Sequence, residues 1–173
     1  TQVAPMTHKS LRAFFMAAPM IYAAVSRLAA EHATPVQIMR LKDTQTLFRA
    51  AIRDGDVAER AMMNQRFHAV IGEMADNEYL SPSLRRLLID HTRIAMTFYS
   101  PQTESLASQR RIAADQHDQF IELIERRDAD AAAALAVAHW ELSRAEIERF
   151  VIPAGMQIPL GQAPAALNTR GSA

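Results

Sequence analysis

Residues 57–75 have the sequence VAERAMMNQRFHAVIGEMA, in which apolar side chains recur at spacings of three and four residues. This spacing predicts an amphipathic α-helix, because positions three and four apart share one helix face. Two polar residues, Asn64 and His68, interrupt the apolar face and project within about 40° of one another, one turn apart. The face as a whole contains Val57, Ala61, Asn64, His68, Ile71 and Ala75. The fold must therefore supply partners for a buried amide and a buried imidazole.

The sequence around this stretch marks the ends of further helices. Thr34 and Pro35 are typical of a helix N-cap followed by a first-turn proline. Gly55 and Asp56 are typical of the end of one helix and the start of the next. No window alternates as a β-strand does, and no repeat recurs. We expect an all-α antiparallel bundle of about six helices with an internal pocket, over residues 8–32, 35–53, 56–75, 79–99, 104–127 and 129–150.

Composition excludes several classes of protein. The 173 residues include 19 Lys and Arg against 19 Asp and Glu, so the chain lacks the excess of cations that nucleic-acid binding requires. There is no cysteine, which excludes disulfide frameworks, thiolate metal sites and cysteine nucleophiles. No apolar run approaches a membrane span of about 18 residues, and no signal peptide opens the chain. We expect a cytoplasmic protein that does not bind a membrane.

The chain divides at about residue 151. Residues 1–151 are expected to form the helical ligand-binding domain, and 152–173 an irregular tail that is either disordered or, as we favour, docked on the bundle or on a neighbouring molecule. Regular helix is excluded in the tail by its prolines and glycines, Pro153, Pro159, Pro164, Gly155, Gly161 and Gly171.

Two more histidines lie on predicted buried faces. His117 shares its face with Phe120, Ile121 and Ile124, and His139 lies between Leu135 and Leu142. Burying imidazoles without partners costs a few kcal/mol each, so something must satisfy them. A divalent transition metal such as zinc or nickel does so, with Asn64, His68, His117 and His139 as the candidate ligands. Such a site, without a carboxylate ligand, stays positively charged and attracts a small carboxylate effector.

Other interpretations of these residues remain open. A histidine on an apolar face is more often a hydrogen-bonded core residue than a metal ligand. His91 also falls in an apolar stripe, so it is either a core residue or part of the effector-binding wall. Arg93 either pairs with an effector carboxylate or is a surface arginine. The glutamates and arginines of residues 141–149 are expected on a solvated face.

Five segments have a familiar pattern: Arg27-Leu28-Ala29-Ala30-Glu31-His32-Ala33-Thr34, Asn64-Gln65-Arg66-Phe67-His68, Gln116-His117-Asp118, Arg126-Arg127-Asp128-Ala129-Asp130-Ala131-Ala132 and Ala138-His139. Together they resemble the FCD domain, the C-terminal effector-binding domain of FadR-subfamily GntR transcription regulators. The resemblance covers about residues 8–150. It implies a helical bundle with an internal metal held by an Asp or Asn and three histidines, which correspond to the four candidate ligands. The family often has Asp where this chain has Asn64, and its winged helix-turn-helix domain would precede residue 1.

Three functions are compatible with these features. The first is an effector sensor, not an enzyme, that works as a homodimer and binds operator DNA through the preceding domain. The second is a helical metalloenzyme using the same three histidines. Hydrolysis needs a general base near the metal, and none is expected on the three inward faces, which favours sensing. The third is a metal-free bundle with hydrogen-bonded histidines.

Overall fold

The computed structural model describes residues 7–98 and 104–151, and all of its regular structure is α-helical. The predicted tail at 152–173 lies outside the described residues. The six helices begin and end within two residues of the predicted bounds. They are α1 (His8–His32), α2 (Pro35–Asp54), α3 (Val57–Ala75), α4 (Leu80–Phe98), α5 (Glu104–Glu125) and α6 (Ala129–Val151). The all-α prediction is confirmed.

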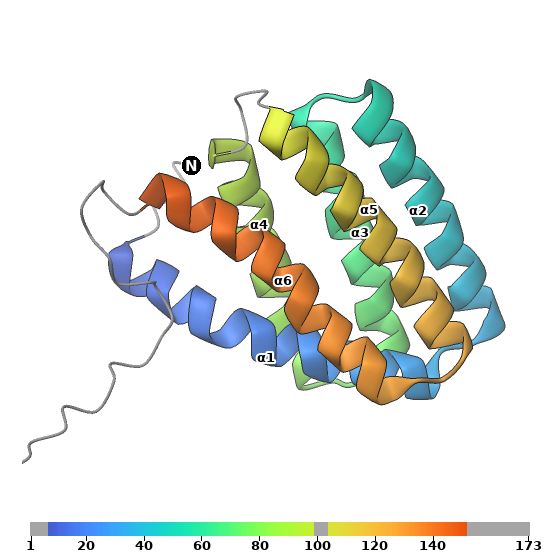
Figure 1. Cartoon of the computed structure of the whole chain (residues 1–173). Helices are drawn as coiled ribbons and strands as arrows, with labels where there is room; N and C mark the ends of the chain where they lie inside the picture. The colour runs from blue at the N-terminus through green and yellow to red at the C-terminus, as the bar shows by residue number, and fades with distance from the viewer. Residues whose placement is uncertain (1–6, 99–103, 152–173) are drawn as a thin grey trace, which may run out of the picture.

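Local sequence explains the boundaries at both ends of α2. Thr34 and Gln37 form a reciprocal capping box around Pro35, so the backbone N–H groups of Thr34 and Gln37 both have side-chain acceptors. At its other end Gly55 follows α2, and the Asp56 side chain accepts from the backbone N–H of Glu59 to begin α3. The short connection between α2 and α3 places these two helices side by side in opposite directions (Figure 1).

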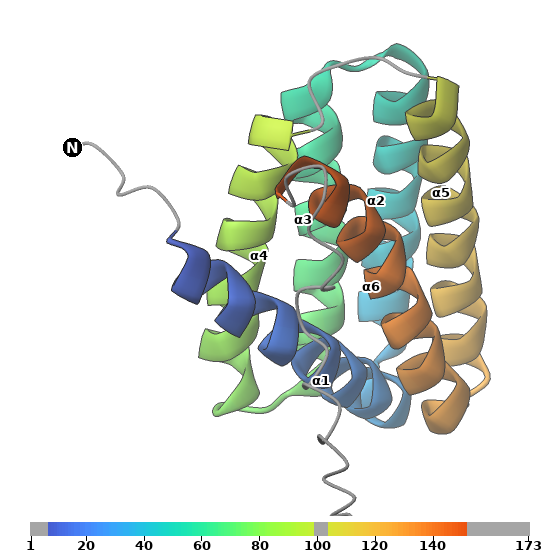
Figure 2. The same ribbon diagram turned by 60° about the vertical axis from the view of Figure 1, so that its left-hand side comes forward.

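The helices surround α3. It packs against α1, α2 and α4, while α6 packs against α1 and α5. Figure 1 shows α2 to α5 running alternately up and down, so that α3 and α5 run in the same direction, with α1 and α6 crossing in front of them. The view in Figure 2 shows α1 steeply inclined to the other helices. Side chains from α1, α3, α5 and α6 thus converge in the middle of the bundle.

The first helix corrects one prediction from the sequence. By length and composition Lys9–His32 is apolar enough to cross a membrane, with a mean hydropathy of 1.5 and 44% of its window buried inside the protein. The sequence prediction that no stretch approaches a span is therefore wrong for this segment. The physical reason lies in its packing, because Phe15, Ala18 and Val25 are core residues. A helix that contributes one face to a protein core passes the same test.

Candidate metal centre and effector cavity

Three histidines from three helices meet inside the bundle. His68 comes from α3, His117 from α5 and His139 from α6, and one ring nitrogen from each lies within 4.8 Å of the others. The Nε2 atoms of His68 and His139 are 3.2 Å apart. Two imidazole nitrogens on one tetrahedral zinc ion are about 3.3 Å apart, given bonds of about 2.0 Å. The spacing therefore suits a shared metal ion.

Hydrogen bonds to two glutamines fix which nitrogens face the cluster. His139 donates from Nδ1 to the Gln116 side-chain oxygen at 2.8 Å, and His117 donates from Nδ1 to the Gln45 side-chain oxygen at 3.1 Å. An amide oxygen only accepts, so the proton of each ring is on Nδ1 and the lone pair is on Nε2. The Nε2 atom of His117 is fully buried and has no hydrogen-bond partner. A metal ion would satisfy this nitrogen.

The orientation of Gln45 is itself held by further contacts. Its side-chain nitrogen donates to the backbone oxygen of Ala114 and to Asp118 Oδ1, both at 2.8 Å. Arg49 pairs with the other carboxylate oxygen of Asp118. The amide oxygen is therefore turned toward His117, in the manner of the outer-shell groups that orient metal-binding histidines.

Burial keeps all three imidazoles neutral. It lowers the pKa of His139 to about 3, assisted by the charge of His91. Burial, with repulsion from the other histidines, also lowers the pKa values of His68 and His117 well below the usual range. Neutral imidazole is the form that coordinates a metal. The donor set therefore fits a divalent transition metal without further deprotonation.

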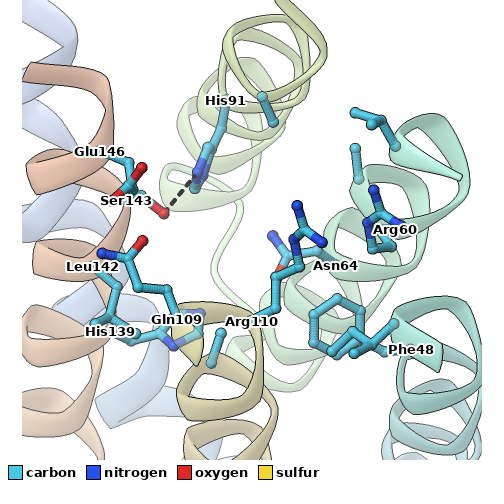
Figure 3. Close-up of a pocket in the computed structure, with 15 residues that line it drawn as sticks. Phe48, Arg60, Asn64, His91, Gln109, Arg110, His139, Leu142, Ser143 and Glu146 are labelled. Carbon is cyan, nitrogen blue, oxygen red and sulfur yellow. Dashed lines mark hydrogen bonds between the residues drawn. The ribbon is translucent and has the colours of Figure 1, made fainter. Parts of the chain in front are cut away.

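A cavity of about 130 Å³ opens beside the histidines. Figure 3 shows Asn64, Arg60 and Arg110 on one side of it, and His91, Ser143 and His139 on the other. Asn64 lies on the cavity wall one turn before His68. Its role as a fourth ligand stays a prediction. The lining residues are Phe48, Ile52, Val57, Arg60, Ala61, Asn64, His91, Ala95, Gln109, Arg110, Ala113, His139, Leu142, Ser143 and Glu146.

The two residues predicted to bind the effector have different positions. His91 lines the cavity, and its ring lies between the hydroxyl of Tyr22, 3.2 Å from Nδ1, and that of Ser143, 3.1 Å from Nε2. Burial lowers the pKa of His91 to about 4. Arg93 forms an ion pair with Asp90 at 3.3 Å and is not among the lining residues. Only His91 is therefore placed where an effector would touch it.

Sequence reasoning missed several polar residues of the site. It placed Glu146 on a solvated face, whereas the structure buries it to 4% exposure on the cavity wall. The signal was present, because Glu146 follows His139 by seven residues and so shares its helix face. Gln45 was also detectable, since it lies four residues from the buried Leu41. The pairing of Gln116 with His139 needed the structure, because periodicity does not say which side chains meet across helices.

Comparison with known proteins agrees with this arrangement. The family model of the FCD domain matches residues 17–142, which contain α2 to α5 completely, parts of α1 and α6, and all three histidines. No curated protein matches the chain. FCD domains are the ligand-sensing domains of GntR-family transcription regulators. The chain belongs to the FCD domain family.

Proposed function

We propose that this domain senses a small organic acid through a bound divalent metal, and thereby controls DNA binding by a winged helix-turn-helix domain outside this sequence. The observation that carries the proposal is the cluster of His68, His117 and His139, with the buried Nε2 of His117 lacking a partner. The three neutral imidazoles would hold the metal and leave its charge uncompensated. A carboxylate entering from the adjoining cavity would supply that compensation.

The surroundings of the cluster support binding. The cavity joins His139 to the cationic side chains of Arg60 and Arg110, so an anion would meet positive charge on more than one side. His91 and Ser143 add hydrogen-bonding groups on the opposite wall. We also propose a homodimer in the full-length regulator, since a symmetric operator has two half-sites and each is bound by one DNA-binding domain. Sedimentation of the full-length protein as a strict monomer would contradict that part.

The proposal is tested by titrating organic acids into the protein with and without metal. Protein stripped by a chelator and reloaded with zinc or nickel should bind acid, and the stripped protein should not. The His117→Ala variant should bind both metal and acid more weakly or not at all, while His32→Ala serves as the control, because His32 bonds to the Ala75 backbone oxygen away from the cluster. Acid binding that survives metal removal would contradict the proposal.

The metalloenzyme alternative now has one candidate base. Glu146 is the only carboxylate among the described lining residues of the cavity. If the site were hydrolytic, Glu146→Gln would abolish turnover of ester or amide substrates while leaving metal bound. A sensor shows no turnover in either form, so the same assay separates the two functions.

A further inference from the structure

Two arginines form a cationic pole of the cavity that the metal centre does not explain. Arg60 lies on α3 and Arg110 on α5, and both line the cavity. The Nη2 atom of Arg110 is buried without a hydrogen-bond partner. Arg60 donates from Nη1 to the Gly55 backbone oxygen at 2.5 Å, which holds its guanidinium in place. Figure 3 shows the Arg110 guanidinium pointing into the cavity on the side of Arg60.

The number of residues between each arginine and histidine gives their separation along the helix axis. On α3, Arg60 precedes His68 by eight residues, which is about 12 Å along the axis. On α5, Arg110 precedes His117 by seven residues, which is about 10 Å. Because α3 and α5 run in the same direction, both arginines lie toward the same end of the bundle from the histidines. The cavity thus extends between the two arginines and His139 of the candidate metal centre.

The two positive charges of Arg60 and Arg110 exceed the negative charge among the described lining residues of the cavity. Burial and the charge of Arg60 lower the pKa of Arg110, although a guanidinium stays protonated at any physiological pH. Glu146 supplies the only negative charge among the described lining residues. Two guanidinium groups on one cavity wall favour a carboxylate, which they can bind through paired hydrogen bonds. Glu146 disfavours a ligand with a third acidic group, because like charges repel.

Cavity size limits the ligand further. A volume of about 130 Å³, where one water needs about 10–15 Å³, has room for roughly ten non-hydrogen atoms. A dicarboxylic acid of about four to six carbons has eight to ten such atoms, within that rough limit.

We propose that the effector is a short dicarboxylic acid, with one carboxylate at the metal centre and the other held by Arg60 and Arg110. This inference rests on the proposed function, because the first carboxylate needs the metal. It adds that Arg60 and Arg110 select diacids over monoacids of the same chain length. Arg110 supplies the unsatisfied donor and Arg60 the adjoining charge.

Calorimetric titration of the zinc-loaded protein tests the inference with matched acids. Succinate, glutarate and adipate are compared with butyrate, valerate and hexanoate. At least one diacid should bind about tenfold or more tightly than its monoacid, as a charge-assisted contact predicts. In Arg110→Gln and Arg60→Gln, the preference for a diacid over its monoacid should be lost, while metal stoichiometry stays unchanged. Arg111→Gln is the matched control, since Arg111 is the exposed neighbour of Arg110 on the same helix.

The outcomes separate this inference from the proposed function. Metal-dependent binding of monoacids and diacids with equal affinity would overturn the diacid inference and leave the sensor proposal intact. Binding of no acid, or binding independent of metal, would overturn both. Tighter binding of a phosphorylated monoacid such as 3-phosphopropionate than of glutarate would overturn the choice of a second carboxylate. Circular dichroism of each variant, unchanged from wild type, shows that a lost affinity is not lost folding.

Discussion

The side-chain oxygen of Gln45 lies 3.1 Å from Nδ1 of His117, and this contact joins α2 to the candidate metal centre. It holds the ring proton on Nδ1 and leaves Nε2 as the coordinating atom. Behind it, Asp118 accepts from Gln45 and is paired with Arg49 at the surface. The centre is thus oriented by a chain of polar contacts that ends in an exposed ion pair.

Replacing Gln45 tests this orientation. Gln45→Leu removes the acceptor for His117 Nδ1 with little change in volume, so metal should bind about 10–100-fold more weakly. Competition titration with a chromogenic chelator measures the change. Gln109→Leu is the matched control, because Gln109 lines the cavity from α5 without a hydrogen bond to the histidines. Equal metal affinity in Gln45→Leu and wild type would show that the contact does not orient the ring.

Replacing Asn64 by aspartate should separate the metal from the acid. A charged oxygen near His68 should tighten metal binding. It would also remove about one unit of positive charge, worth roughly 1–4 kcal/mol to a nearby anion. Asn64→Asp at saturating metal should therefore bind an organic acid about tenfold or more weakly, measured by calorimetry. Equal or tighter acid binding would contradict the charge argument.

The stability of metal-free protein should fall in mild acid. Burial lowers the pKa of His91 to about 4 and that of His139 to about 3, whereas an unfolded histidine titrates near about 6.5. Between these values the unfolded chain binds more protons, so the free energy of unfolding decreases as the pH falls below about 6.5. At about pH 5 the loss is roughly 2 kcal/mol for each such histidine.

Urea unfolding in the presence of a chelator measures this dependence. The His91→Gln variant should lose less stability between about pH 7.5 and about pH 5 than wild type, because it has one titrating group fewer. Unfolding midpoints that do not move with pH would mean that the histidines are not held neutral by burial.

An arginine in the turn between α5 and α6 closes the end of α1. Arg127 has a positive φ of 59° and donates to the backbone oxygens of Ala30, Glu31 and Ala33, the last at 2.6 Å. These are unpaired carbonyls at a helix C-terminus, which a cation stabilises. Arg127→Ala should lower the free energy of unfolding by about 1–3 kcal/mol. Arg126→Ala, at the exposed neighbouring position, should change it by less than about 0.5 kcal/mol.

The sequence was sufficient for the helices because their ends are determined locally. Thr34 and Asp56 act as caps through bonds to residues three positions away, and such bonds follow from sequence spacing. The convergence of His68, His117 and His139 was predictable for a related reason, since each interrupts an apolar stripe at helical spacing. Because each histidine shares its helix face with apolar residues, packing of that face into the core buries the histidine as well.

The polar partners of the histidines were harder to predict. Gln116 lies about 100° around α5 from His117, and only the packing of α6 brings it to His139. Nothing in the sequence distinguishes Arg60 and Arg110 from surface arginines, because a sequence does not show that helices enclose a cavity between them. The prediction that Glu146 lies on a solvated face was wrong because it was based on the charged residues around it, although Glu146 shares its helix face with His139. Periodicity predicts which way a side chain points, but contacts across helices depend on the packing.

X-ray absorption at the metal edge of zinc-loaded protein tests the central claim most directly, because it counts the imidazoles on the ion. The account predicts three histidine nitrogens at about 2.0–2.1 Å with one or more further oxygen ligands, and a change in those oxygen ligands when acid is added. His117→Ala should lower the imidazole count to two or abolish binding. A spectrum with one imidazole or none, unchanged by His117→Ala, would contradict a metal held by His68, His117 and His139.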